Sequence, residues 1–246
     1  MKLSKRTVLV SFLSLLLLAS GLVGLAQDGN SSSQNQQKTT TVAKVNGAEI
    51  TRQELSQSAQ VYPIIMTLSR QFRSFGQFLM SSEAGQEFLK EYRKYVLDKM
   101  IDQKIQQQKI EDLGISVSDQ EVQKEIDKII ESNKQFSDEK SLKDYLKKNQ
   151  NMKLADLKSR IKESLKSKKL REEVTGNVSV SEDEISSYYE KNKQSFKDQE
   201  GNVKALEDVR GQIKNTLKSQ KRSEKFSSWL EQARKDADVK KNLENI

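Results

Sequence analysis

The residue types that most often perform chemistry in proteins are scarce in this sequence of 246 residues, which contains no Cys and no His. Their absence excludes thiol nucleophiles, disulfides, imidazole bases and zinc sites of the usual kind. Carboxylate pairs occur at Glu111–Asp112, on a polar helix face, and at Asp183–Glu184, where a helix start favours negative charge. No Gly-rich phosphate loop, nucleophile elbow or metal-spaced cluster appears, so we expect no catalytic residue, metal or cofactor.

The side chains that could bind a partner are apolar and crowd the segment 55–80 without keeping to one narrow helix face, and two more follow at the start of the next helix. They could pack as core on the helix that follows, or line an open cradle for unfolded peptides. Flexible thioethers and aromatic rings suit such a cradle because they adapt to many partners. Both interpretations stay open for any single residue. The candidate cradle residues are Tyr62, Met66, Phe72, Phe75, Phe78, Met80, Phe88 and Tyr92.

A long amphipathic helix over 87–113 must position these side chains. Leu89, Tyr92, Val96 and Met100 recur three or four apart, which places an apolar stripe on one face, and Gly114 suits a left-handed helix end. The preceding segment, 55–80, is also helical in pattern, but Pro63 predicts a kink or a new start.

Turn and capping signals divide the rest of the chain. Two short apolar segments flank Asn46-Gly47, which predicts a β-hairpin over 42–50. Ser or Thr followed three residues later by Glu predicts helix starts at Thr51, Ser118 and Ser181, and a shorter helix is expected to begin at Ser137 or Ser141. Few breakers and many Lys, Glu, Gln and Leu favour helix elsewhere, so the fold class is mostly α.

The first 26 residues combine a basic start, an apolar run and small residues at Gly24 and Ala26, which predicts a secretory signal peptide cleaved before Gln27. The alternative is an uncleaved anchor, which would be the only contact with a membrane. Residues 27–41 are polar and are expected to form a flexible linker. Either interpretation places the rest of the chain outside the cytoplasm, in a periplasm or cell envelope or as a secreted protein.

The net charge is +8, yet basic and acidic residues alternate at helical spacing and form no long block. That pattern is typical of a solvated helix surface with many ion pairs. We therefore expect no nucleic-acid partner.

Three segments carry a resemblance to a known family: VAKVNGAEITRQEL at 42–55, DLGISVSDQEVQKEI at 112–126 and NVSVSEDEISSYYEKNKQSF at 177–196. They resemble the SurA/PrsA group of extracytoplasmic foldases. The segment 207–239 is also similar to the C-terminal helix and strand of that group. The resemblance implies a multi-helix chaperone domain over 42–246, with an N-terminal part at 42–196 and a returning helix at 206–239. It also implies that a final strand at 237–239 joins the hairpin near 42–45.

In the SurA/PrsA group, the segment ending at Phe196 leads into a parvulin-type prolyl isomerase domain. Only nine residues, 197–205, follow here before the next apolar pattern, whereas a small domain needs on the order of a hundred. Parvulin-type sites also use His, which is absent. We therefore expect that the isomerase domain is missing and that the protein is not an enzyme.

The predicted function is that of an ATP-independent chaperone that binds unfolded or newly exported polypeptides by mass action. Three alternatives remain: a helical envelope adaptor with one specific partner, a degenerate prolyl isomerase, and a coiled-coil rod. The rod ranks last because heptads are not sustained.

Overall fold

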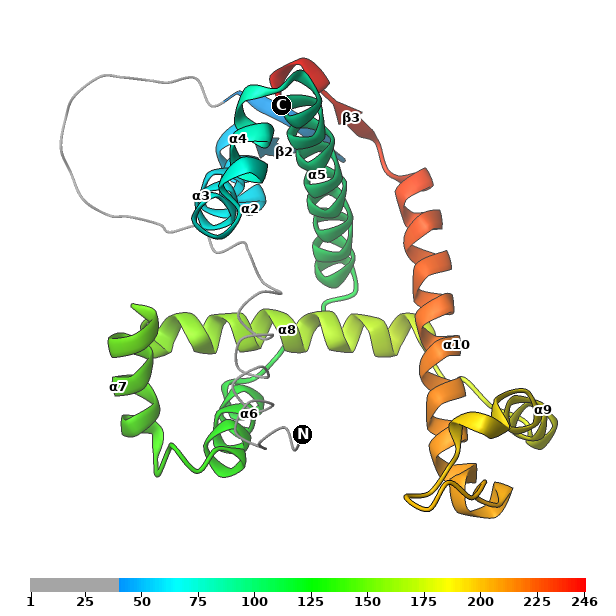
Figure 1. The fold of residues 1–246 in the computed structure, drawn as a ribbon. Coiled ribbons are helices and arrows are strands. Elements are labelled where there is room, and N and C mark those ends of the chain that lie inside the picture. The colour runs from blue at the N-terminus through cyan, green and yellow to red at the C-terminus, as the bar shows by residue number, and fades with distance from the viewer. Residues whose placement is uncertain (1–39) are drawn as a thin grey trace. The chain divides into compact units, whose positions relative to one another are not determined.

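The computed structural model describes residues 40–246, so the predicted signal peptide at 1–26 and all but the end of the predicted linker at 27–41 lie outside the described residues. Within this range the chain forms two compact units (Figure 1). The first contains residues 40–168 together with 236–246, and the second contains Lys169–Lys235.

The prediction of a mostly α fold with a small sheet is confirmed. The helices and strands are β1 Thr41–Val45, β2 Ala48–Thr51, α2 Arg52–Ala59, α3 Val61–Gln71, α4 Arg73–Ser81, α5 Glu83–Asp112, α6 Asp119–Ser132, α7 Glu139–Gln150, α8 Leu154–Thr175, α9 Glu182–Asn192, η1 Lys193–Ser195, α10 Leu206–Asp236, β3 Val239–Lys241 and η2 Leu243–Asn245.

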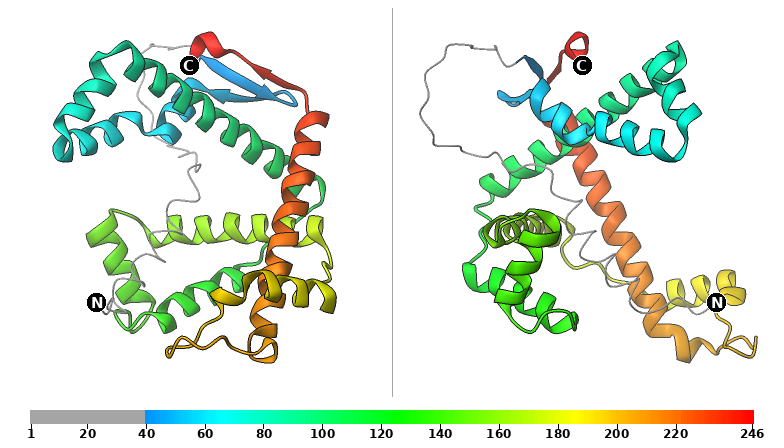
Figure 2. Two further views of the ribbon diagram at one scale, coloured as in Figure 1. Left: turned by 45° about the vertical axis from the view of Figure 1, so that its right-hand side comes forward. Right: turned by 60° about the vertical axis from the view of Figure 1, so that its left-hand side comes forward.

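The sheet joins the two ends of the described chain. Its strand order is β2-β1-β3, and both pairings are antiparallel. The turn between β1 and β2 has positive φ at Asn46 (49°) and Gly47 (84°), the conformation that the Asn-Gly pair predicts. The predicted C-terminal strand is present beside β1, shifted toward the C-terminus, with Val239 opposite Val45 (Figure 2).

The three predicted capping boxes are present. Their backbone N–H groups donate to the Glu carboxylates over 2.7 Å at Thr51 and 2.9 Å at Ser118 and Ser181. The prediction that Ser137 or Ser141 caps α7 is wrong, because the cap residue is Asp138. Its Oδ1 accepts from the Ser141 N–H over 2.7 Å, and this bond holds the pKa of the Asp138 carboxyl below its usual value.

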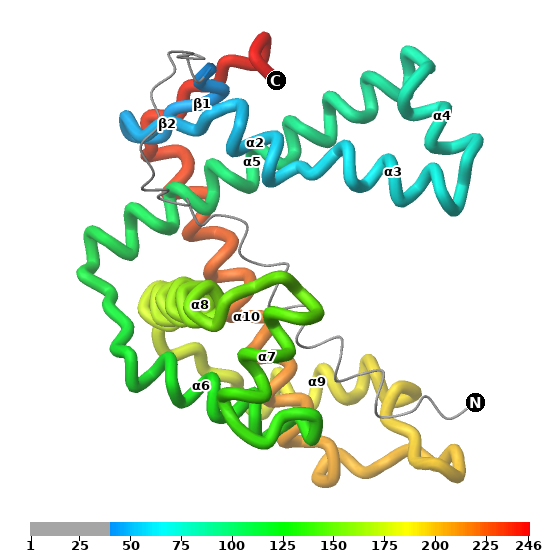
Figure 3. Tube along the Cα trace, turned by 90° about the vertical axis from the view of Figure 1, so that its left-hand side faces the viewer, coloured from blue at the N-terminus to red at the C-terminus, as the bar shows by residue number. Residues whose placement is uncertain are grey.

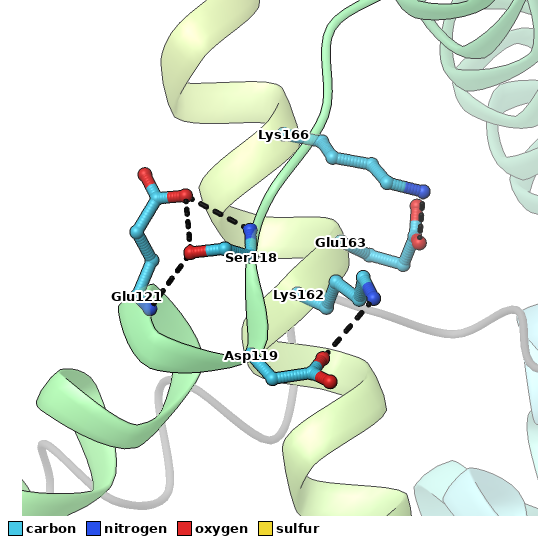
Figure 4. A network of polar contacts seen from close by, with 6 residues as sticks. All are labelled: Ser118, Asp119, Glu121, Lys162, Glu163 and Lys166. Carbon is cyan, nitrogen blue, oxygen red and sulfur yellow. Dashed lines mark hydrogen bonds and ion pairs between the residues drawn. The ribbon is translucent and has the colours of Figure 1, made fainter.

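Helices α6, α7 and α8 share a small core of their own. Buried side chains from all three contribute to it: Val117, Val122, Ile126, Phe136, Leu142, Leu146, Leu157 and Ile161. Polar contacts flank this core at the start of α6, where Lys162 lies 3.5 Å from the Asp119 carboxylate and Ser118 pairs with Glu121 (Figure 4). Within each helix these core residues recur at the spacing that places them on one helix face.

The second unit contains a separate core between α9 and α10. Ile185, Tyr189, Phe196, Val209 and Ile213 are buried there. The Tyr189 hydroxyl donates to the Lys204 carbonyl oxygen over 2.7 Å. This bond ties the loop between α9 and α10 to the aromatic cluster.

The Asn46 side chain connects three separate segments of the first unit. Its Nδ2 donates to Gln108 Oε1 of α5 over 2.8 Å, and its Oδ1 accepts from the Asp238 N–H over 2.8 Å. Gln108 also donates to the Val45 carbonyl oxygen over 3.0 Å. One amide therefore links the hairpin turn, the long helix and the entry to β3.

We predict that Asn46→Gly lowers the free energy of unfolding of the first unit by about 1 kcal/mol, because glycine keeps the positive φ but loses both side-chain hydrogen bonds. Urea unfolding followed by circular dichroism measures the loss. Asn151→Gly is the matched control, since Asn151 has φ 48° and no side-chain hydrogen bond within the described residues. Equal losses in the two variants would contradict the role given to the Asn46 amide.

Candidate functional site

Helices α3 and α4 and the first part of α5 form the structure that presents the candidate residues. We call this part, residues 61–95, the helical arm. Its helices pack against one another in sequence order and extend away from the three-stranded sheet (Figure 3). The sequence predicted one interrupted helix over 55–80, whereas the chain forms three, with breaks at Gln60 and Phe72. Gln60 has φ 48°, so the break precedes Pro63, which lies in the first turn of α3.

The arm is held together by a core of only three buried side chains, Ile65, Leu79 and Leu89, with Val61 and Leu68 partly buried beside them. Two glycines allow this small core. A Cβ added to Gly76 would overlap the Ser69 side chain. One added to Gly85 would overlap the Phe78 carbonyl oxygen and lie 2.6 Å from Leu79 Cα. Neighbouring helices therefore approach backbone to backbone, without large side chains between them.

Close packing of this kind leaves the large apolar side chains of the arm outside. Among the described residues, eight of the eleven exposed large hydrophobic side chains lie between Tyr62 and Tyr95. Phe72 is 60% exposed and Phe88 57% exposed, and the Phe75 and Phe78 rings stack with centroids 6.2 Å apart. A concentration of exposed apolar surface in one place is typical of an interaction site, whereas single exposed apolar residues are common everywhere.

The candidate residues divide into two groups. Tyr62, Phe72, Phe75, Phe78, Met80 and Phe88 are exposed, while Met66 and Tyr92 are half-buried. Two exposed residues of the arm were not among the candidates, Ile64 and Tyr95. Tyr95 could have been found from its spacing, since it lies three residues after Tyr92 and seven after Phe88, on one face of α5.

A groove lies at the base of the arm. It encloses about 340 Å³ and is lined by residues of α2, α3 and α5 and by Met80 at the end of α4; these residues are Ser56, Ala59, Val61, Tyr62, Pro63, Ile65, Met80, Gln86, Leu89 and Arg93. Gln86 donates to the Met80 carbonyl oxygen over 2.7 Å and so fixes the turn between α4 and α5. The lining is mostly apolar with one cation, Arg93, so the groove can accommodate an apolar side chain next to a negative group.

The arm also has an uneven charge distribution. Residues 55–82 include Arg70 and Arg73 but no acidic residue. Charge pairs return in α5, where the Glu91 carboxylate accepts a hydrogen bond from Lys94 and raises the pKa of that lysine. Helices α3 and α4 themselves thus carry only positive charge beside their exposed rings.

Residues 40–246 contain no group of three carboxylates that could hold a metal ion. In the described part of the chain, no helix combines the length and the apolar character that a membrane crossing needs.

Comparison with known proteins identifies relatives along the whole chain. The family described as SurA-like N-terminal domain matches residues 1–171, and the family described as PPIC-type PPIase domain matches residues 180–246. A foldase protein PrsA of Clostridium botulinum (strain Okra) is 32% identical over 159 residues, which are 64% of this chain and 46% of the relative. A foldase protein PrsA of Caldanaerobacter subterraneus is 28% identical over 182 residues, or 74% of this chain and 52% of the relative. The chain thus spans about half the length of these relatives.

A solved structure has a similar fold. It is a chain from work on two structurally related SurA-like chaperones of Campylobacter jejuni, with a TM-score of 0.61 and 15% sequence identity. The similarity covers 82% of this chain and 98% of that one.

The expectation that a parvulin-type domain is missing is wrong, because the PPIC-type domain family matches residues 180–246. The expectation that the protein is not an enzyme is contradicted by the same match and by the foldase relatives. The first expectation assumed that such a domain must be an insertion after Phe196, and the second rested on that assumption and on the absence of His. The match instead begins before α9 and continues through α10 and β3, the segments that were taken to be only its flanks.

We predict that Gly85→Ala destabilises the arm by about 1 to 3 kcal/mol, because the new Cβ would force α4 and α5 apart. Thermal unfolding followed by circular dichroism, with limited proteolysis of the arm, measures the effect. Gly211→Ala is the matched control: nothing lies within 4 Å of a Cβ added there, so alanine should stabilise α10 by roughly 0.5 to 1 kcal/mol. Stabilisation by both substitutions would show that the close approach at Gly85 does not hold the arm together.

Proposed function

Since this chain belongs to the SurA-like N-terminal domain family, we propose that it is an extracytoplasmic foldase that binds unfolded or newly exported polypeptides through the helical arm. The observation that carries the proposal is the concentration of exposed aromatic and Met side chains on a part of the chain whose own core does not need them. The chaperone and foldase relatives support the same function.

The geometry favours weak and reversible binding. Fully burying one Phe side chain contributes about 1.5 to 3 kcal/mol, and the rings of the arm are already partly covered, so each contributes less. Association itself costs at least about 4 kcal/mol, so several rings must be covered at once before a complex accumulates. A client segment with several apolar residues meets this condition while it is unfolded and loses it as it folds.

This energy balance makes ATP unnecessary for release. A binder that covers apolar segments lowers the free concentration of unfolded clients by mass action, and folding removes the binding sites. The exposed rings stack without filling a deep pocket, which suits many sequences better than one. A helical adaptor for one specific protein would instead show a single saturable partner.

Prolyl isomerisation is a second candidate function, and the match of the PPIC-type domain family to residues 180–246 favours it. In that segment Tyr188, Tyr189 and Phe196 form an aromatic cluster, with ring centroids 5.9 Å apart for Tyr189 and Phe196. Both activities would serve one role, because a client held by the arm could have its prolyl bonds isomerised.

We predict that replacing Phe72, Phe75 and Phe78 together with Ser weakens binding of a reduced, unfolded test protein about tenfold or more, since three exposed rings lose their contacts with the client. The melting temperature should fall by only a few degrees, because these rings lie outside the arm core. Aggregation of two unrelated denatured proteins, measured by light scattering with the chain lacking residues 1–26, provides the readout.

The control variant replaces Leu113, Val203 and Leu243 with Ser, since these side chains are 43%, 41% and 45% exposed but lie outside the arm. It should suppress aggregation as well as the unchanged chain does. If the Phe variant unfolds, the rings are core, and if both variants suppress aggregation equally, the arm is not the binding surface.

For the second candidate function, we predict that the chain accelerates cis/trans isomerisation of a proline-containing test peptide above the uncatalysed rate in a protease-coupled assay. The Phe72, Phe75 and Phe78 variant should retain this activity on a short peptide, because its substitutions lie outside residues 180–246. A rate equal to background at all enzyme concentrations would contradict isomerase activity.

A further inference from the structure

A basic pocket lies within the second unit and is distinct from the α9–α10 core. It is bounded by the last part of α8 and by one face of α10, and encloses about 370 Å³. Every lining side chain is a cation or a neutral hydrogen-bonding group; the lining residues are Arg171, Asn215, Lys218, Ser219, Arg222 and Ser223. The five residues of α10 recur at intervals of one, three and four, so they share one helix face.

The cations of this pocket have no anionic partner within residues 40–246. Arg222 Nε is buried and makes no hydrogen bond there, and Lys218 forms no ion pair in the same range. Arg171 holds its guanidinium 4.0 Å above the centroid of the Phe226 ring, which fixes its position and leaves its N–H groups available. The lining contains no carboxylate that could neutralise the three charges.

Three other cations of α10 have hydrogen-bonding or anionic partners. Lys221 lies 2.5 Å from the Glu184 carboxylate, Lys225 donates to the Thr175 carbonyl oxygen over 2.7 Å, and Arg210 lies 2.7 Å from Glu182. Lys218 and Arg222 instead stand four residues apart, a spacing at which like charges destabilise a helix. An unpaired buried donor adds a further cost. Both costs disappear when an anion occupies the pocket.

We propose that this pocket binds a phosphate group. A phosphate offers several acceptor oxygens and up to two negative charges, which matches two guanidinium groups, one ammonium group and two hydroxyls better than a single carboxylate does. The phosphate could be a free ion or the headgroup of an anionic phospholipid. In the second case the pocket would hold the second unit at a membrane surface, independently of the clients bound by the arm.

The test compares a pocket variant with a control variant of equal charge. Lys218→Gln with Arg222→Gln removes two pocket cations, and Lys191→Gln with Lys197→Gln removes two exposed cations outside the pocket. Binding of inorganic phosphate is measured by calorimetry and by NMR shifts. Binding to vesicles of phosphatidylglycerol is compared with binding to vesicles of phosphatidylcholine. The chain lacking residues 1–26 is used throughout, so the predicted leader cannot insert into the vesicles.

We expect the pocket variant to bind phosphate about tenfold or more weakly and the control variant to bind as the unchanged chain does. If the pocket variant loses binding of inorganic phosphate, the free ion is the ligand. If it loses only binding to phosphatidylglycerol vesicles, the ligand is the headgroup. An equal loss of binding in the two double variants would mean that net charge alone causes the effect, and this would overturn the site. The absence of binding to both inorganic phosphate and phosphatidylglycerol vesicles would also overturn it. If the double variant unfolds, Lys218→Gln alone must weaken binding about threefold or more for the proposal to stand.

Discussion

The close backbone contact of α4 with its two neighbours is the constraint on which the proposed function depends. At Gly85 the helices meet backbone to backbone, and at Gly76 only the small Ser69 side chain faces the glycine, so Ile65, Leu79 and Leu89 suffice as the core of the arm. A looser contact would need larger residues to fill it, and the nearby Phe rings would be the obvious choice. The rings remain on the surface because small residues already complete the packing. This arrangement uncouples the stability of the arm from the surface that it presents.

The two ends of the described chain also pair with each other. β3 pairs with β1, and the Asn46 side chain accepts from the Asp238 N–H, a hydrogen bond between residues 192 positions apart. The first unit is therefore complete only when the last residues have returned to it. The chain passes between the two units twice, once within α8 and once at the end of α10. The segment matched by the PPIC-type domain family thus shares strands and helices with both units.

Local sequence signals predicted much of this fold. The Asn-Gly turn, the capping boxes at Thr51, Ser118 and Ser181 and the helix end at Gly114 depend on a few adjacent residues, and each is present. The breaks at Gln60 and Phe72 were missed because neither residue type signals a helix end. The Asp138 cap was missed because two nearby Ser residues are equally good candidates. Exposure of the arm could not be decided from spacing, since it depends on how closely the glycine-containing faces approach.

Two features could not be predicted from the sequence. A PPIC-type domain was expected only as an insertion after Phe196. The family match instead covers residues 180–246, whose helices and strand had been interpreted as the segment that returns the chain to its N-terminal part. The basic pocket combines Arg171 of α8 with one face of α10, and no local pattern joins residues so far apart. Both depend on tertiary contacts, whereas caps and turns do not.

The central claim is that unfolded polypeptides lie against the exposed rings of the arm. The most direct test replaces Phe75, and separately Leu113, with a photoreactive phenylalanine analogue, then irradiates the chain with an unfolded client and identifies the adducts by mass spectrometry. An aromatic probe at position 75 preserves the ring, so binding is undisturbed. The account predicts strong crosslinking from position 75 that disappears when the client is folded, and little from position 113. Equal yields at the two positions, or a yield at 75 that persists with folded client, would contradict it.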